Sequence, residues 1–366
     1  VYNGLSRLFA MAFNIPYTWC VVTMAAFTAL YVILGGYMAT AINDFIQGII
    51  MLIGIVAVIA AVLNGQGGFM NAIAEMAKIP SDVPLTQGQP GAFTSFFGPD
   101  PVNLLGVVLL TSLGTWGLPQ MIHKFYTIRS EKAIATGTVI STLFAVIVAG
   151  GCYFLGGFGR LFSDQIDIAA NGYDSVIPTM LSGLPDVLLA VVVVLVLSAS
   201  MSTLSSLVLT SSSTLTLDLL KDHVWKDMDQ KRQVFVMRCL IVVFIAISVV
   251  LAIIQYRSSV TFIAQLMGVS WGALAGAFLA PFLYGLYWKK ATSAACWASF
   301  LFSTVVMLSN IFVGSRFPAL LQSPINAGAF CMLAGLVIVP VVSLFTRKPD
   351  PVLVEDAFSC YNKPVI

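Results

Sequence analysis

The sequence predicts an all-α protein that crosses a membrane many times. Hydrophobic residues make up 58% of the chain and charged residues only 9%, whereas soluble domains are typically about 25% charged. The apolar residues form runs of about 20, the length needed to cross a bilayer core. The loops between these runs are alternately rich in basic and acidic residues. These three observations indicate a multi-pass protein of the cell (plasma or inner) membrane, with the lipid bilayer as its first partner.

Nine apolar segments are long enough, or nearly long enough, to span the bilayer core. The segments between them are polar and too short for independent domains. We therefore expect a single transmembrane domain over residues 1–346 and a cytoplasmic tail over residues 347–366. The predicted spans are 17–34, 42–63, 102–122, 132–157, 187–212, 233–254, 260–286, 293–313 and 326–346.

Basic residues gather in every second loop, as they do in cytoplasmic loops. This places the C-terminus and a short turn at Gly35–Ala41 in the cytoplasm, and residues 1–16 outside. The external loop 64–101 is expected to hold a short helix over 69–77, and the fifth span should continue as a helix to Leu220. The clustered bases are Lys124, Arg129 and Lys132, then Lys221, Lys226, Lys231 and Arg232, then Lys289 and Lys290, then Arg347 and Lys348.

Several classes of function are not supported by the sequence. No basic patch is combined with stacking aromatic residues, which argues against nucleic acid as a partner. The six cysteines are dispersed without the spacing of a disulfide framework or a Cys/His metal site. The GVSWG stretch at Gly268–Gly272 matches a nucleophile pattern, but it lies within an apolar span rather than on a strand-to-helix turn. We expect neither an enzyme nor an obligatory protein partner.

The fifth span changes from a purely apolar segment to one rich in serine and threonine between Leu197 and Lys221. Helical spacing places six small or hydroxyl-bearing residues on one face. Hydroxyls concentrated in this way should face protein or a water-filled cavity, where their oxygens can replace the hydration shell of sodium. Alternatively, the small residues let two helices pack closely, with hydroxyls bonded across the contact. The six residues are Ala199, Ser202, Thr203, Ser206, Thr210 and Ser213.

Asp44 stands near the start of the second span without a basic neighbour. An ionisable group at such a position is a candidate for ion binding or transport. The alternative is structural, because Asn43 or Asp44 could cap the helix. Gln47, one turn further on, could share the polar face with Asp44.

Two other spans contain candidate solute-binding residues. The third span includes Gly114, Gly117 and Pro119, which disfavour a continuous helix. Transporters place broken helices at the membrane midplane, although a plain cytoplasmic helix end would also explain the three residues. In the seventh span Gly268, Gly272 and Gly276 suggest either a cavity or, more often, close helix contacts. The candidate solute-binding side chains are Thr111, Thr115, Trp116, Pro119, Ser270 and Trp271.

Four stretches resemble the sodium:solute symporter family, in order along the chain: GGYMATAINDFIQG, SLGTWGLPQMIHKF, SASMSTLSSLVLTSSSTLTLDLLK and VSWGALAGAFLAPFLYGLYWKK. The resemblance implies a leucine-transporter-like inverted-repeat fold and alternating access driven by sodium. It also implies that the carbonyl oxygen of Ala199 and the hydroxyls of Ser202 and Thr203 bind sodium. Asp44 matches an acidic residue that flanks the inner cation path, and Pro119 matches the proline that follows the broken solute-contacting helix.

The resemblance also implies that about nine of about thirteen transmembrane helices are present. The first four would then be missing, including one that supplies the partner half of both sites. We therefore expect the 366-residue chain alone not to transport, a prediction that sodium-dependent uptake in liposomes would contradict. The family pattern places Thr115 and Thr111 where proline carriers have aromatic side chains, and NIPY at Asn14–Tyr17 resembles the pantothenate branch.

The sequence favours secondary active transport, with sodium as the coupling ion and a small organic solute as the cargo. The solute is expected to be pantothenate-like, amino-acid-like or monocarboxylate-like. Proton coupling remains an alternative because Asp44 could titrate. A channel or sensor that uses the same helices without coupling is a further alternative.

Overall fold

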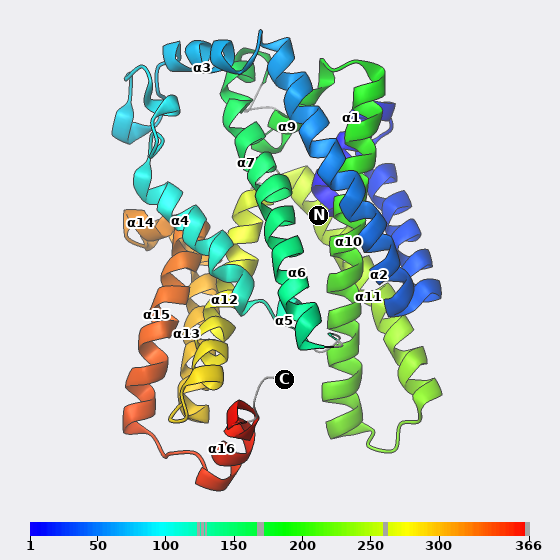
Figure 1. Cartoon of the computed structure of the whole chain (residues 1–366), viewed down its shortest axis with the longest axis vertical. Coiled ribbons are helices and arrows are strands. Elements are labelled where there is room, and N and C mark those ends of the chain that lie inside the picture. The colour runs from blue at the N-terminus through cyan, green and yellow to red at the C-terminus, as the bar shows by residue number, and fades with distance from the viewer. Residues whose placement is uncertain (123–124, 126–127, 129, 167–171, 259–262, 363–366) are drawn as a thin grey trace. The chain divides into compact units, whose positions relative to one another are not determined.

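The computed structural model describes residues 1–122, 125, 128, 130–166, 172–258 and 263–362, without the side chains of residues 36–40, 131, 258 and 362. Within those residues every regular element is a helix (Figure 1), as predicted. Eight helices there are long and apolar enough to span a membrane. They cover 17–35, 41–65, 132–165, 186–224, 230–257, 263–287, 293–316 and 324–345, close to eight of the predicted spans.

The remaining predicted span, 102–122, is not a continuous helix. It consists of α4 (Pro101–Ser112), a single 3-10 turn η3 (Gly114–Gly117) and α5 (Pro119–Ile122). Glycine at both ends of η3 and proline at the start of α5 explain the interruption, because neither residue favours a helix interior. The prediction of a broken helix is confirmed, and the ninth predicted span is an interrupted segment instead of one continuous helix.

The chain divides into two compact units, residues 1–79 with 136–262 and residues 80–135 with 263–366. The first unit contains α1 (Tyr2–Phe13), α2 (Tyr17–Gly65), α3 (Phe69–Lys78), α7 (Gly150–Gly157), α9 (Val176–Ser182), α10 (Asp186–Thr214) and α11 (Gln230–Ser258). A longer helix, α6 (Glu131–Phe144), leads into this unit and continues through the π-helical turn η5 (Ala145–Ala149) into α7. The short helix α3 confirms the prediction over 69–77.

The second half of α10 is extended by a π-helical segment, η8 (Leu215–Val224). The fifth predicted span therefore does continue past residue 212, and it reaches Val224 rather than Leu220. Its 39 residues correspond to about 58 Å at 1.5 Å per residue. This length exceeds a hydrocarbon core of about 30 Å, so the polar end extends beyond the apolar region.

Helix α2 contains two spans that fold back on each other. The Tyr31 hydroxyl donates a hydrogen bond to the Met201 carbonyl, and a Cβ at Gly54 would meet Leu195 at 2.7 Å. In a straight helix the two α2 residues would be about 35 Å apart, whereas their partners on α10 are about 9 Å apart. Both arms of α2 therefore flank α10 (Figure 1). The predicted turn at Gly35–Ala41 falls mainly on residues 36–40, whose side chains lie outside the described part of the chain.

Helix α10 is the centre of the first unit. Its N-terminal part packs with the second arm of α2 through Val192, Leu195, Ile55 and Val62. Its middle part, at Leu204, packs with the first arm of α2 and with α11. Close packing on these sides fixes the rotation of α10, and so determines which of its hydroxyls are buried.

The second unit is built on three packed helices, α12 (Ile263–Tyr287), α13 (Ser293–Val313) and α15 (Pro324–Phe345). A Cβ at Gly272 would lie 2.6 Å from the Gly328 Cα atom, and one at Gly276 would lie 2.8 Å from the Cys331 Cβ atom. These glycines let α12 and α15 approach closely, as small residues do in membrane helices. Close helix contact is therefore what the glycines of the seventh span provide.

The C-terminal tail forms a short helix, α16 (Pro351–Phe358). The Tyr361 hydroxyl donates a hydrogen bond of 3.0 Å to the Leu286 carbonyl, and the Lys289 Nζ atom lies 5.5 Å from the centre of the Phe358 ring. The tail thus contacts the end of α12 within the same unit.

Candidate functional site

Three oxygens of the predicted sodium site gather in one turn of α10. The Ser202 and Thr203 hydroxyls both donate to the Ala199 carbonyl, at 3.1 and 3.0 Å. Such bonds to the preceding turn are common for serine and threonine in helices. Ser205 and Ser212 make them too, so the bonds alone do not specify a cation. They do place each of the two hydroxyl oxygens within 3.1 Å of the Ala199 carbonyl oxygen.

The hydroxyl face predicted for α10 is not the face that its neighbours in the first unit bury. Ala199 and Ser202 are half-buried and Thr203 is exposed, whereas Ser198, Ser205 and Ser212 are buried. At about 100° per residue, the two sets lie on different sides of α10. Within the first unit, the side chains of the predicted sodium face are therefore only partly covered.

Tyr31 is a residue of this region that the sequence interpretation missed. Its hydroxyl donates a 2.7 Å hydrogen bond to the Met201 carbonyl, in the same turn as the predicted sodium ligands. The Ser205 hydroxyl lies beside this phenol, and the Asp44 carboxylate is near enough to act on it through its charge. A tyrosine within an apolar span needs a hydrogen-bond partner for its hydroxyl. This requirement could have marked Tyr31 in the sequence as a residue that contacts another helix.

Asp44 therefore lies in the electrostatic neighbourhood of Tyr31. It is half-buried and lies inside the second arm of α2, three residues after the span begins at Ala41. The proposal that Asn43 or Asp44 is the N-cap residue of this span is therefore wrong. Gln47 is buried, and its Oε1 atom has no hydrogen-bond partner among the described residues. A buried, unpaired acceptor is costly, and a cation would relieve that cost.

Replacing Tyr31 with phenylalanine should remove the hydrogen bond that joins α2 to this turn of α10. Loss of the hydroxyl leaves the Met201 carbonyl without its side-chain partner, at an expected cost of about 1 kcal/mol. We expect a lower thermal midpoint and a higher sodium requirement for uptake. Tyr284→Phe is the matched control, since its hydroxyl makes a similar 2.8 Å bond to the Leu336 carbonyl in the other unit. An equal sodium requirement for uptake in the two variants would show that Tyr31 does not contribute to sodium binding.

The broken third span carries four of the six candidate solute-binding residues. The Thr111 hydroxyl donates to the Val107 carbonyl at 2.8 Å, and the Thr115 hydroxyl donates to the Ser112 carbonyl at 2.9 Å. Trp116 is 58% exposed, and Pro119 begins α5. A large exposed aromatic side chain on an interrupted helix is suited to contact a ligand.

The other two candidates differ in their surroundings. Trp271 packs in a core cluster with Leu110 and Met332, and a Cβ at Gly114 would lie 3.7 Å from its ring. It therefore supports the broken helix from α12. Ser270 is exposed, and its hydroxyl donates to the Met267 carbonyl of its own helix at 3.3 Å. This bond does not connect Ser270 to the other candidate residues.

The candidates therefore form two groups. The cation set, Ala199, Ser202, Thr203 and Asp44, belongs to the first unit, and the solute set belongs to the second. Within each group the residues come from elements distant in sequence: α2 with α10 in one, η3 with α12 in the other.

A helix broken within its apolar span is a feature of secondary transporters. Comparison with known proteins gives the family. The sequence model of the sodium:solute symporter family matches residues 3–303, and the chain belongs to this family.

Curated relatives agree with that assignment. The chain is 28% identical over 332 residues to the sodium/pantothenate symporter of Escherichia coli K12, a match that covers 87% of the chain and 65% of that protein. It is 27% identical over 362 residues to the sodium/proline symporter of Staphylococcus aureus, covering 96% of the chain and 66% of that protein. The chain thus spans about two thirds of the length of these relatives. They are transporters and not enzymes.

A solved structure shares the fold. The chain matches a Na+-coupled sialic acid symporter with a TM-score of 0.68 at 16% identity, over 95% of this chain and 75% of that one. The predicted leucine-transporter-like fold is confirmed by this likeness.

Proposed function

We propose that the protein couples the inward movement of sodium to the uptake of a small organic solute by alternating access. The observation that carries this proposal is the group of three oxygens in the Ala199–Thr203 turn of α10. This turn belongs to a chain of the sodium:solute symporter family. Membership of a symporter family and the transported solutes named for its relatives support it.

In this proposal sodium binds the Ala199 carbonyl oxygen and the Ser202 and Thr203 hydroxyl oxygens. All three are neutral acceptors that can stand in for water around a monovalent ion. Their side of α10 is only partly covered within the first unit, which leaves room for further ligands. Asp44, whose charge acts on the phenol of Tyr31, favours a cation near this turn electrostatically.

The proposed solute contacts are Thr111, Thr115, Trp116, Pro119, Ser270 and Trp271. Trp116 carries the largest exposed apolar surface of these, and the interrupted helix offers backbone polar groups beside it. The relatives are named for pantothenate and proline, and both solutes contain a carboxylate. We propose a small carboxylate-bearing solute for this protein as well.

The energy for uptake comes from the sodium gradient. A positive charge that moves inward through 100 mV releases about 2.3 kcal/mol, and the concentration gradient adds to this. One sodium ion per electrically neutral solute, such as a zwitterion, is thus sufficient at 100 mV for roughly fiftyfold accumulation from the potential alone. For a solute of net charge −1 the two charges cancel, and the sodium concentration gradient supplies the energy.

Uptake by the full-length protein tests the proposal. Proteoliposomes should accumulate radiolabelled pantothenate, proline or a monocarboxylate when an inward sodium gradient is imposed. Replacing external sodium with choline at fixed pH should lower the initial rate at least tenfold.

Uptake that persists in choline and follows an imposed proton gradient would instead establish proton coupling, with Asp44 as the titrating candidate. Solute flux that never exceeds equilibrium would establish a channel. Either result would contradict sodium-coupled transport.

The C-terminus is proposed to be cytoplasmic, on the basis of the loop charges. An epitope introduced at the C-terminus should then be inaccessible to antibody in intact cells.

A further inference from the structure

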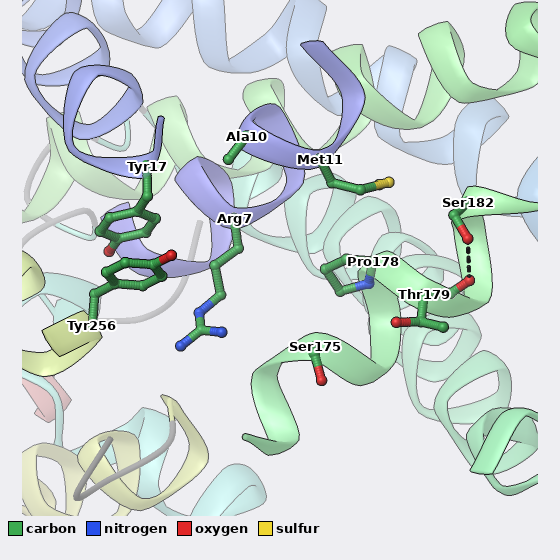
Figure 2. A pocket seen from close by; sticks show the side chains of 9 residues that line it. All are labelled: Arg7, Ala10, Met11, Tyr17, Ser175, Pro178, Thr179, Ser182 and Tyr256. Atoms are coloured by element: carbon green, nitrogen blue, oxygen red, sulfur yellow. Dashed lines mark hydrogen bonds between the residues drawn. The ribbon is translucent and has the colours of Figure 1, made fainter. Parts of the chain in front are cut away.

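A polar cavity lies in the first unit where α1 meets α9, away from the predicted sodium turn. Its volume is about 310 Å³, which is enough for a small organic solute. Figure 2 shows its walls, with Arg7, Ala10 and Met11 on α1 facing Pro178, Thr179 and Ser182 on α9. Tyr17, Ser175 and Tyr256 complete the lining. The loop charges place this end of the helices outside the cell.

Arg7 is held in place by residues that are themselves fixed. Its Nε–H group donates a 3.0 Å hydrogen bond to the Asn3 Oδ1 atom, and its guanidinium carbon lies 5.3 Å from the centre of the Tyr256 ring. Tyr256 in turn stacks on Tyr17, with ring centres 3.8 Å apart. The Tyr17 hydroxyl donates to the same Asn3 oxygen and lies 3.3 Å from the Ala252 carbonyl. Asn3 and Tyr17 are 3% and 4% exposed.

This arrangement fixes the guanidinium before any ligand arrives. Pre-organised donors bind more strongly because less side-chain freedom is lost on binding. The terminal nitrogens of an arginine present paired N–H donors that match a carboxylate in both charge and geometry. In Figure 2 the Arg7 side chain reaches between Tyr256 and Ser175 into the space that these residues line.

The rest of the lining also suits a small carboxylate with an apolar body. Ala10, Met11 and Pro178 supply apolar surface. The Ser175 hydroxyl donates to the Gly172 carbonyl and the Ser182 hydroxyl donates to the Thr179 carbonyl, so their oxygens can accept a hydrogen bond from an ammonium group but have no proton left for a carboxylate. Asp174 accepts a 3.4 Å hydrogen bond from the Asn3 Nδ2 atom, which adds a negative charge near the cation. A ligand that carries an ammonium group beside its carboxylate can use both charges.

We propose that this cavity is a separate binding site for a small organic carboxylate, with Arg7 as the residue that recognises the carboxylate group. The site requires neither sodium nor the residues of the predicted transport path. The proposal of this site can therefore be tested separately from the proposal of sodium-coupled transport.

Three ligands of nearly equal shape test the site. They are proline, cyclopentanecarboxylate, which lacks the amine, and prolinol, which lacks the carboxylate. Binding to the purified full-length protein can be followed by ligand-observed NMR titration in choline chloride without sodium. At least one of the two carboxylates should bind, and prolinol should bind at least tenfold more weakly. Equal binding of prolinol, or no binding by either carboxylate, would overturn the proposal.

Variants locate the binding. Arg7→Gln should weaken carboxylate binding by about tenfold or more, as expected for loss of a charge-assisted pair. Lys78→Gln is the matched control, because it removes the same charge from an exposed residue of α3 that pairs with Glu75. Thr179→Phe keeps Arg7 and its supports and fills the cavity, so it should abolish binding even if Arg7→Gln fails to fold. Binding that survives Thr179→Phe but is lost in Ser202→Ala would place the ligand elsewhere and overturn the proposal.

Discussion

Replacing Ser202 and Thr203 together with alanine is expected to raise the sodium concentration for half-maximal uptake at least tenfold. The change removes two of the three oxygens that meet in this turn. A lost ligand to a charged group typically costs 1.5–3 kcal/mol, or about 10- to 150-fold in affinity. The maximal rate at saturating sodium should change less than the sodium requirement.

The fold should tolerate this double substitution. Both hydroxyls bond within their own helix, Thr203 is exposed, and alanine is the best helix former. Ser212→Ala is the matched control, since its hydroxyl makes the same type of bond, to the Leu209 carbonyl, three turns further on. An unchanged sodium requirement in the double variant, with normal expression, would reject the assignment of these ligands.

Replacing Gly272 with alanine is expected to destabilise the second unit strongly, because the new methyl group would clash with the backbone of α15. The new Cβ would lie 2.6 Å from the Gly328 Cα atom and 2.9 Å from the Met307 Cε atom. The methionine can move, but the backbone of α15 can move only if the helix pair separates. Overpacking of this kind costs about 1–3 kcal/mol, and we expect the upper end of that range. The measurement is the thermal midpoint of the detergent-solubilised protein.

Gly285→Ala provides the comparison within the same helix. Nothing lies within 4 Å of a Cβ at Gly285, so the substitution adds helix propensity without a clash. Relief of the glycine penalty should stabilise the protein by roughly 0.5–1 kcal/mol. Equal midpoints for the two variants would mean that α12 and α15 are not in the close contact described above.

The sequence was sufficient to predict most of the helices, because membrane spans are defined by long apolar runs. Eight predicted spans agree closely with observed helices, and glycine and proline correctly marked the break between α4 and α5. The sequence did not show that this break would leave α4 too short to span. Hydropathy averages over a window, and the apolar residues of η3 extend the run without extending the helix.

The details of the candidate site were harder to predict. Helical spacing correctly grouped Ala199, Ser202 and Thr203, but it could not say which side of α10 its neighbours would cover. That depends on how α2 and α11 pack, as does the burial of Ser205. Tyr31 was missed for the same reason, since its partner is a carbonyl 170 residues away. Contacts between distant segments are not encoded in local periodicity.

Direct sodium binding is the measurement that tests the central claim most closely. The purified full-length protein, without solute and in choline buffer, should bind ²²Na+ saturably in an equilibrium assay. The Ser202→Ala/Thr203→Ala variant should lose most of this binding, while Ser212→Ala should retain it. Undiminished saturable binding in the double variant, or no saturable binding by the unmodified protein, would contradict a sodium site at the Ala199–Thr203 turn.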